Sequence, residues 1–407
     1  MHHKRVLQEK NKLILDIKRL RNHLRSYEPT IEELKKRHES AMKEKMLIKL
    51  ERDRLKARVK ALEEQVASMT EQEKEELSPK QRSATRTVRK KAVFPVDGAV
   101  VNPFSDREFE PARAENFSTR KTFKGHLSSI SACAFHPKKP IFATASDDET
   151  WRLWTTPDCD LVMSGEGHTG WLSGLHFHPH GSHLVTSSGD STIKIWEFNQ
   201  ARCTHTFTDH TQAVWGCEFH YGGDLVASCS MDHTVRVWDL IAGKCRQTLR
   251  GHVDSVNAVA WQPYTSNVCS ASGDKTLSVW DARSGLCVQT LYGHSNACND
   301  LCISNRGDVI VSSDADGVIK VWDIRMVAEL GTIDAGHHPI NKVRMDRSGT
   351  RVVAASDDGT VKVFSLTDFS LINSLTGHTD AVQCVAMAPN DSYMISGSSD
   401  CSFRVWG

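Results

Sequence analysis

Histidine and aspartate residues recur through the C-terminal part of the chain at a nearly constant spacing. Seven histidines follow one another at steps of 41 to 43 residues, and each is followed after 27 or 28 residues by Trp or, once, by Phe. An Asp precedes each of these aromatic residues by six positions. His and Asp are typical of metal sites and of acid–base catalysis, so the pattern raises the question of whether it builds such a site.

The seven-fold recurrence favours a structural role for these residues, because a catalytic site occurs once in a chain. A fixed period of about 42 residues is the signature of a repeat architecture. Short segments within each period, such as residues 192–196 and 234–238, alternate apolar and polar residues as half-buried strands do. There is no Walker A loop, no GxSxG motif and no cluster of candidate catalytic residues outside the repeat. We therefore expect a non-enzymatic protein with no cofactor and no bound metal.

The period and its Gly-His and Trp-Asp markers resemble the WD40 family, which builds one four-stranded propeller blade per repeat. This resemblance implies an all-β, seven-bladed WD40 β-propeller over residues 117–407. It also implies that His, Ser or Thr, Asp and Trp form a hydrogen-bonded tetrad in each complete blade. The tetrads expected in this way are His126, Thr144, Asp148, Trp154; His168, Thr186, Asp190, Trp196; His210, Ser228, Asp232, Trp238; His252, Ser270, Asp274, Trp280; His294, Ser312, Asp316, Trp322; and His378, Ser396, Asp400, Trp406.

The sixth and seventh repeats depart from the pattern in different ways. The sixth has Ala354 in place of Ser or Thr and Phe364 in place of Trp, so its tetrad cannot form fully and we expect the loosest blade there. The seventh ends at Gly407, one residue after its Trp, and so lacks an outer strand. Residues 118–124 match the missing strand, and we expect them to close the ring and remove its open edge.

The N-terminal region has a different period. Apolar residues repeat in a 4-3 pattern from Val6 to Met69, which predicts an α-helical coiled coil over residues 1–77 with a possible break near Pro29. Lys45 and Arg52 fall at core positions and favour a two-stranded coil, which is either homomeric or heteromeric. Residues 78–116 read as a basic, Pro-containing linker.

Charge divides the chain into two parts. Residues 1–91 have an excess of Lys and Arg, and the remainder has an excess of Asp and Glu. The basic part is either a solvated surface or a contact for a polyanion such as nucleic acid or tubulin. The first ten residues lack the apolar core of a signal peptide, and no run of eighteen apolar residues occurs. We expect no membrane partner and a location in the cytoplasm and cytoskeleton.

Segments in both halves carry a narrower resemblance. MHHKRVLQEKNKL and SYEPTIEELKKRH in the coil, and GEGHTGWLSGLHFHP and DKTLSVWDARSG in the propeller, are similar to the sperm-associated antigen 16 family. This resemblance implies a scaffold of the axonemal central apparatus of motile cilia and flagella, bridging the two central microtubules and required for motility. It implies partners among central-pair proteins and tubulin, contacted directly or indirectly, and no small-molecule substrate.

Partner-binding candidates are the residues near the rim of the central channel that do not belong to the tetrads. The side chain five positions after most of the repeated histidines should face the channel. In addition, two Trp residues and one Met are not required by the repeat pattern, and such residues are enriched as binding anchors. The candidates are Trp171, Trp215, Met231, Asn257, Asn299 and Asn341. The alternative for the two Trp residues is that they pack under neighbouring loops.

A second function remains open at this point. Residues 280–283 and 322–325 read Trp-Asp-x-Arg on neighbouring repeats, a pattern found in WD40 substrate receptors of cullin-type ubiquitin ligases and also in ordinary WD40 repeats.

Overall fold

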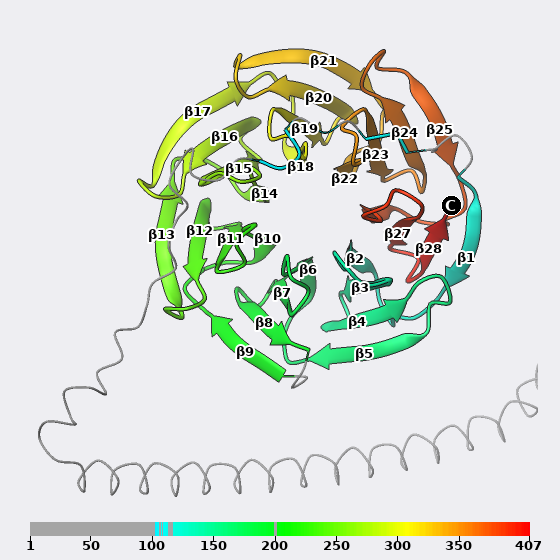
Figure 1. The fold of residues 1–407 in the computed structure, drawn as a ribbon, viewed down its shortest axis with the longest axis horizontal. Coiled ribbons are helices and arrows are strands. Elements are labelled where there is room, and N and C mark those ends of the chain that lie inside the picture. Colours follow the sequence, from blue (N-terminus) through cyan, green and yellow to red (C-terminus); the bar gives the residue numbers. More distant parts are fainter. Residues whose placement is uncertain (1–101, 106, 108, 113–116, 199–201) are drawn as a thin grey trace, which may run out of the picture. The chain divides into compact units, whose positions relative to one another are not determined.

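The computed structural model describes residues 102–105, 107, 109–112, 117–198 and 202–407. The coiled coil predicted for residues 1–77, and the linker up to residue 101, lie outside the described residues. Every regular element of the described chain is a β-strand, and the strands form seven four-stranded antiparallel sheets arranged in a ring (Figure 1). The seven-bladed propeller predicted from the repeat is confirmed. No helix of the described residues is long and apolar enough to cross a membrane.

Each blade runs from an inner strand at the channel to an outer strand at the rim. Blade 1 contains β2 (Ile130–Phe135), β3 (Ile141–Ser146), β4 (Thr150–Thr155) and β5 (Leu161–Glu166); blade 2 contains β6 (Leu172–Phe177), β7 (His183–Ser188), β8 (Ile193–Glu197) and β9 (Arg202–Phe207); blade 3 contains β10 (Val214–Phe219), β11 (Leu225–Ser230), β12 (Thr234–Asp239) and β13 (Lys244–Arg250). Blade 4 contains β14 (Val256–Trp261), β15 (Asn267–Ser272), β16 (Thr276–Asp281) and β17 (Leu286–Tyr292).

The remaining blades follow the same order, except that the last borrows its outer strand. Blade 5 contains β18 (Cys298–Ile303), β19 (Val309–Asp314), β20 (Val318–Asp323) and β21 (Ala328–Asp334); blade 6 contains β22 (Ile340–Met345), β23 (Arg351–Ser356), β24 (Val361–Ser365) and β25 (Leu371–Leu375). Blade 7 contains β26 (Val382–Met387), β27 (Met394–Ser398), β28 (Phe403–Trp406) and β1 (Thr119–Phe123).

The apolar core lies between successive blades rather than at the centre of the ring. The second strand of each blade is buried on both faces, and β11, for example, has no residue that reaches the surface. Trp280 of blade 4 packs among Leu225, Val237 and other buried residues of blade 3. Because each sheet is covered by its two neighbours, strands buried on both faces read as nearly continuous apolar runs.

The ring is closed by the pairing of β1 with β28 (Figure 1). Thr119 lies opposite Trp406 and Phe123 lies opposite Phe403, and the rings of Phe123 and Phe403 stack with centroids 5.4 Å apart. Phe403 also packs on Trp154 of blade 1, at a centroid separation of 5.0 Å. This pairing gives blade 7 its fourth strand and covers the hydrogen-bonding edge of β28.

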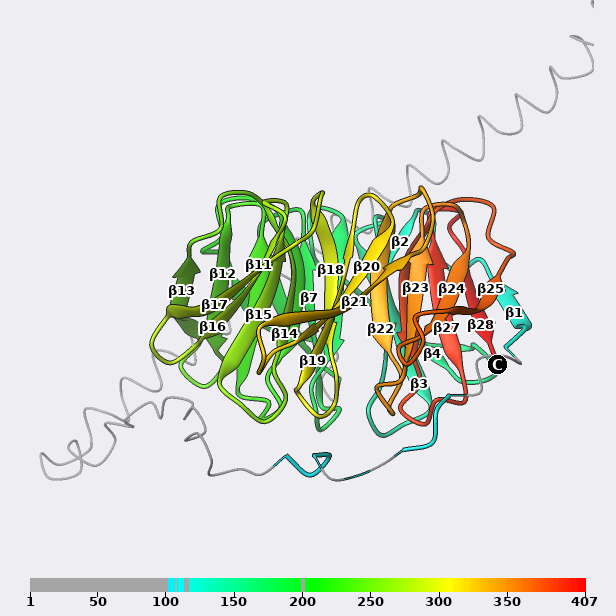
Figure 2. The same ribbon diagram turned by 90° about the horizontal axis from the view of Figure 1, so that it is seen from above.

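A short segment before β1, which we call the strap, crosses one face of the ring (Figure 2). It comprises the described residues from 102 to 112. Asn102 donates its side-chain N–H groups to the carbonyl oxygens of Asn305 and Arg306, at 2.8 and 3.1 Å. The backbone N–H of Ala112 donates to the Asp346 carboxylate at 3.2 Å, and the Arg347 guanidinium lies 4.1 Å from the Phe109 ring centroid. We call this the lower face; it carries the turns between the first and second strands of each blade.

Candidate functional site

The repeated polar residues form closed hydrogen-bond networks inside the blades. In blade 3, His210 Nδ1 lies 2.7 Å from Asp232, His210 Nε2 lies 2.8 Å from the Ser228 hydroxyl, and the Trp238 indole N–H donates to that hydroxyl at 2.8 Å. One set of proton positions satisfies all three bonds: the indole donates to Ser228, Ser228 donates to Nε2, and Nδ1–H donates to the carboxylate. Blades 1, 2, 4 and 7 have the same arrangement on the residues expected from the sequence.

The pKa values of these groups fit an ionised Asp beside a neutral His. Burial alone would raise the pKa of Asp148, but hydrogen bonds from Thr150 and His126 outweigh it and hold the value at about 2. Burial lowers the pKa of His126 despite the opposing effect of Asp148. Among the described residues, no three His, Cys, Asp or Glu side chains gather as a metal site. The residues that first suggested chemistry are therefore engaged in blade architecture.

Blade 5 corrects one of the expected tetrads. His294 Nδ1 lies 2.9 Å from Asp314, not from Asp316, while Ser312 and Trp322 occupy the expected places. Asp314 stands where all six other blades have a Ser at the end of the second strand, and its longer reach brings the carboxylate to the histidine. Asp316 instead accepts hydrogen bonds from Ser295 and Asn296 at the surface.

Blade 6 replaces the network with apolar packing and an ion pair. Ala354 and Phe364 are buried in an apolar cluster with Val352. Asp358, at the tetrad position, lies 2.8 Å from the ammonium of Lys362. That ammonium also donates to a backbone carbonyl oxygen at 2.6 Å. The blade keeps four paired strands, and its reduced stability stays a prediction.

Replacing Ser228 with Ala tests what one network contributes to stability. The change leaves the Trp238 N–H and His210 Nε2 buried without their common partner, so we expect a loss of about 1–3 kcal/mol in the free energy of unfolding. Chemical denaturation measures it, with Ser370→Ala as the control, because that hydroxyl is exposed and its removal should cost within about 0.5 kcal/mol. A Ser228→Ala protein as stable as the control would contradict the structural role.

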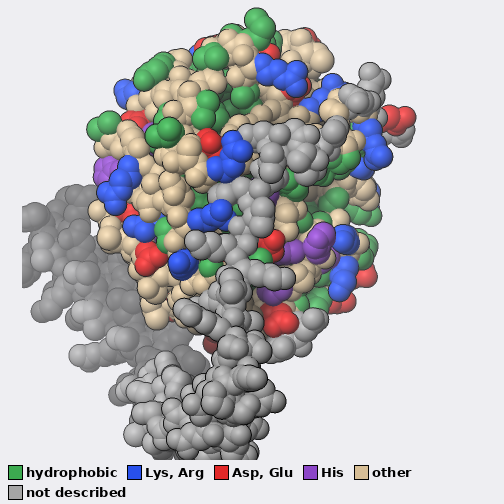
Figure 3. All heavy atoms as spheres, turned by 60° about the vertical axis from the view of Figure 1, so that its left-hand side comes forward, with side chains coloured by type: hydrophobic (Ala, Val, Ile, Leu, Met, Phe, Trp, Pro, Cys, Tyr) green, Lys and Arg blue, Asp and Glu red, His purple; other side chains and the backbone are tan. Residues whose placement is uncertain are grey.

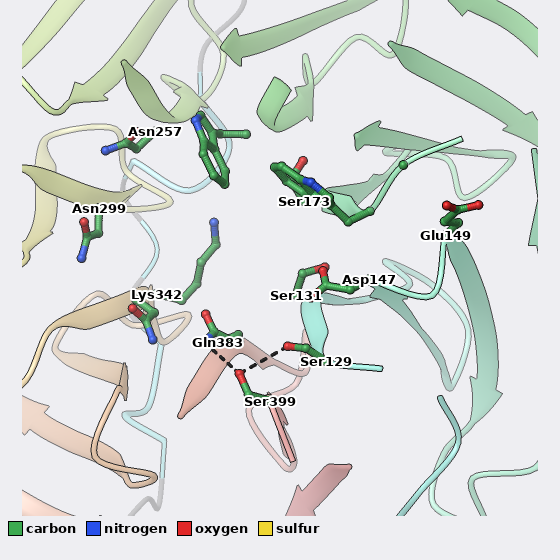
Figure 4. A pocket seen from close by; sticks show the side chains of 14 residues that line it. Ser129, Ser131, Asp147, Glu149, Ser173, Asn257, Asn299, Lys342, Gln383 and Ser399 are labelled. Atoms are coloured by element: carbon green, nitrogen blue, oxygen red, sulfur yellow. Dashed lines mark hydrogen bonds between the residues drawn. The ribbon is translucent and has the colours of Figure 1, made fainter. Parts of the chain in front are cut away.

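A large pocket opens on the face opposite the strap, which we call the upper face. Its volume is about 900 Å³, and it lies at the mouth of the central channel, where the inner strands begin (Figure 4). Residues from all seven blades line it: Ser129, Ser131, Asp147, Glu149, Gly170, Trp171, Ser173, Trp215, Asn257, Asn299, Asn341, Lys342, Gln383 and Ser399. We call it the upper-mouth pocket. It contains five of the six residues predicted to bind partners.

The three predicted asparagines have a second duty that the sequence did not reveal. Asn257, Asn299 and Asn341 each donate a side-chain N–H to a backbone carbonyl of the next blade, at 2.8, 3.1 and 3.0 Å. Ser131 and Ser173 make the equivalent bond with their hydroxyls. These side chains fasten neighbouring blades at the channel mouth, so one N–H donor of each asparagine is already engaged and not free for a partner.

Trp215 occupies the same position in blade 3 but lies against another aromatic residue instead. Its ring centroid is 5.0 Å from that of Trp171, with 38° between the ring planes, and 37% of Trp215 is exposed. Trp171 in turn lies over Gly189, where a Cβ atom would come within 2.3 Å of the indole. The two indoles therefore support each other and both line the pocket, with Trp171 half-buried against the turn at Gly189 and Trp215 more exposed.

Met231 is the predicted residue that falls outside this group. Its side chain is 48% exposed in the turn between β11 and β12, and it does not line the upper-mouth pocket. The sequence indicated an exposed apolar side chain there but not its distance from the pocket.

A charge cluster with the buried carboxylate of Asp300 at its centre lies deeper in the channel, and sequence reasoning missed it. The Asp300 carboxylate is 3.0 Å from the Lys342 ammonium and 2.9 Å from the Arg344 guanidinium, and it also accepts the Val343 N–H at 2.9 Å. Glu218 accepts the N–H of Trp261 at 3.3 Å, and burial raises its pKa to about 7. The signal was present: these charges stand at inner-strand positions where most other blades have Ala, Gly or Cys.

On the uncovered part of the side that Figure 3 presents, apolar, basic and acidic side chains are intermixed. Outer strand β17 exposes Leu286, Cys287 and Val288 at its start and Tyr292 at its end. Scattered exposed apolar residues are normal on a soluble surface and do not mark a site.

A family model described as WD domain, G-beta repeat matches the chain seven times, over residues 117–155, 159–197, 201–239, 243–281, 285–323, 328–365 and 369–407. The chain belongs to the WD40-repeat family. Each WD40 unit begins with the outer strand of one blade and continues with three strands of the next, so residues 117–155 include β1 of blade 7 and β2 to β4 of blade 1.

Three curated relatives show which WD40-repeat proteins this chain is similar to. The chain is 49% identical over 205 residues to flagellar WD repeat-containing protein Pf20 of Chlamydomonas reinhardtii, which covers 41% of this chain and 34% of that protein. It is 37% identical over 196 residues to sperm-associated antigen 16 protein of Homo sapiens (40% and 31%), and 39% identical over 208 residues to that of Mus musculus (40% and 33%). The matches span about a third of the length of these relatives. The resemblance to the sperm-associated antigen 16 family is confirmed. The WD40 propeller and the flagellar relatives point to a non-catalytic scaffold.

The Trp-Asp-x-Arg motifs gain no support from the geometry. The Asp281 carboxylate accepts from Arg283 at 3.3 Å within its own turn, and the Trp280 indole belongs to a tetrad. The Trp and Asp of this motif are engaged within their own blade, and the ligase-receptor function stays a hypothesis.

Proposed function

We propose that this WD40 protein is a non-enzymatic scaffold of the axoneme of cilia and flagella. In this proposal it belongs to the central apparatus, where it helps to bridge the two central microtubules and supports motility. The names of its relatives, one flagellar and two sperm-associated, support this location. The predicted coiled coil would pair the chain with a second copy or with another protein.

The upper-mouth pocket is the proposed docking site for partner proteins. The observation that carries this assignment is the Trp171–Trp215 pair, because large aromatic residues that are exposed yet rigidly held are typical anchors of protein interfaces. The strap lies on the lower face and leaves the upper-mouth pocket open. A pocket of this size lined by side chains from seven blades suits an extended peptide or a loop.

Tubulin is an indirect partner of the propeller in this scheme. Its surface is acidic, and the upper-mouth pocket presents Asp147 and Glu149, so like charges would oppose direct contact there. Contact with the microtubule would pass through the basic N-terminal region or through other central-pair proteins.

Replacing both Trp171 and Trp215 with Ala is expected to reduce incorporation of the tagged protein into axonemes at least fivefold while the propeller stays folded. Fluorescence imaging and axoneme fractionation in motile cells that lack the native protein measure incorporation, and thermal melting of the purified chain checks folding. Met231→Ala is the control, since it removes an exposed apolar side chain outside the pocket. Normal incorporation of the folded double variant would contradict the docking site. A wild-type protein absent from axonemes would contradict the proposed function.

A further inference from the structure

We propose that the upper-mouth pocket recognises a single acidic side chain, glutamate or aspartate, on the partner segment that docks there. This inference rests on the proposed docking function and adds the chemistry of the ligand. The carboxylate of the partner would pair with the ammonium of Lys342, the one basic side chain among the described residues that line the pocket.

Lys342 presents its ammonium to the open mouth of the channel. Its side chain is 23% exposed, and Figure 4 draws it reaching from blade 6 toward the centre of the pocket. Within the described part of the chain, Asp300 is the carboxylate that contacts this ammonium, at 3.0 Å. An ammonium has three N–H donors, so one such contact leaves donors for a second acceptor.

The positive charge around Lys342 exceeds the negative charge that balances it. Asp300 is shared, because its other carboxylate oxygen lies 2.9 Å from the Arg344 guanidinium. Glu218 is a second acid near these groups, but burial raises its pKa to about 7, so it carries only about half a negative charge at neutral pH. A partner carboxylate would supply the missing charge at a place partly shielded from water, where an ion pair is stronger than at an open surface.

The pocket also has room for the partner segment beside Lys342. In blades 1 to 4 the inner-strand residues at the corresponding position have side chains no larger than a methyl group: Ala132, Gly174, Gly216 and Ala258. The volume of about 900 Å³ accommodates a short extended segment. The Trp171–Trp215 pair lines the same pocket and offers an apolar surface to the residues that flank the acid.

The acids at the rim of the pocket limit which acidic ligands fit. Asp147 and Glu149 belong to the turn between β3 and β4, both are exposed, and Figure 4 draws the Glu149 side chain turned away from the mouth. A densely acidic surface, such as that of tubulin, would bring many like charges against this rim. One acidic side chain between uncharged residues meets less repulsion on its way to Lys342. The site therefore favours an isolated acid, in agreement with an indirect role for tubulin.

Two peptides binding to the full chain test the inference: acetyl-Ala-Leu-Glu-Leu-Ala-amide, and the same peptide with Gln in place of Glu. Gln keeps the shape of Glu and removes its charge. Fluorine NMR of the protein labelled with fluorotryptophan follows the Trp171 and Trp215 signals, which are assigned by replacing each Trp in turn with Phe. We expect the Glu peptide to bind about fivefold more tightly at low salt, as one partly exposed ion pair allows.

Replacing Lys342 with Met is expected to abolish this preference. The variant should fold, because Asp300 keeps Arg344 as its partner, and thermal melting checks this. Lys320→Met is the matched control: it removes another lysine that pairs with a carboxylate, that of Glu329 at 2.7 Å, but outside the pocket. The control should prefer the Glu peptide as the wild type does.

The outcomes separate this inference from the proposed function. Equal binding of the two peptides to the wild-type protein, or an unchanged preference in folded Lys342→Met protein, would overturn the acidic-ligand site. If that happens while the double Trp variant still fails to enter axonemes, docking at the pocket stands with another ligand. If the preference depends on Lys342 but the wild-type protein is absent from axonemes, the acidic-ligand site stands and the proposed function fails.

Discussion

Deleting residues 117–124 is expected to destroy the cooperative unfolding of the propeller. The deletion removes β1, exposes the edge of β28, and takes away Phe117, which is buried among residues of blades 6 and 7. It also removes the stack of Phe123 on Phe403. Truncating one buried Phe such as Phe117 typically costs about 3–5 kcal/mol, and the loss of the half-buried Phe123 adds to it, so the total approaches the whole stability of an ordinary domain.

Thermal melting followed by circular dichroism measures this effect. We expect the transition to broaden and its midpoint to fall by at least about 10 °C, because a loss of 1 kcal/mol already moves the midpoint by a few degrees. Lys121→Ser is the matched control, since it alters an exposed side chain of the same strand and keeps the pairing. A deleted protein that melts in a single sharp transition at the wild-type temperature would show that β1 does not hold the ring closed.

Replacing Asp300 with Asn is expected to cost about 1–3 kcal/mol in the free energy of unfolding. The Asp300 side chain is only 2% exposed, and it is the shared counter-ion of Lys342 and Arg344. Removing this buried carboxylate leaves the Lys342 and Arg344 charges without compensation, and their partial exposure, 23% and 36%, keeps the loss below that of a fully buried pair. Urea denaturation at neutral pH measures the loss.

A triple variant that removes all three charges tests whether uncompensated charge causes the loss of stability. Changing Asp300 to Leu together with Lys342→Met and Arg344→Met replaces all three charges with apolar side chains, and we expect stability to return to within about 1–2 kcal/mol of the wild type. If Asp300→Asn alone costs less than about 1 kcal/mol, water screens the remaining charges too well for the ion pairs to contribute to stability. If the triple variant is as unstable as the single one, lost packing rather than stranded charge explains the effect.

The fold followed from the sequence because a repeat multiplies weak signals. A single Gly-His or Trp-Asp pair is weak evidence for a WD40 repeat. Seven copies at a nearly constant spacing determine the number of blades. The closing strand was also predictable, since the residues before the first Gly-His match the strand that the last repeat lacks. The fold is thus set by periodicity, which a single sequence displays directly.

The candidate site was harder to predict, because side-chain reach and contacts between blades do not follow from spacing. Asp316 has the spacing expected for the fifth tetrad, but Asp314 supplies the carboxylate, because its oxygen is the one within hydrogen-bonding distance of His294. Asn257 looked like a free rim residue, but its amide bonds to the neighbouring blade, a contact that appears only once the blades are packed in a ring. The Trp pair was predicted as two separate anchors, and its stacking depends on the absence of a side chain at Gly189.

The pairing of β1 with β28 also has a consequence for how the ring is made during synthesis. Of the propeller strands, β1 leaves the ribosome first and its partner β28 leaves last, so their contacts span almost the full length of the domain. Contacts so distant in sequence are slow to form. Until translation of Trp406, the nascent chain holds an unpaired β1 and an unfinished seventh blade, both with exposed strand edges. The pairing of the first and last strands of the propeller is therefore the folding step at which chaperones would have the most exposed strand edge to protect. A chain whose translation stops before β28 could not complete this step.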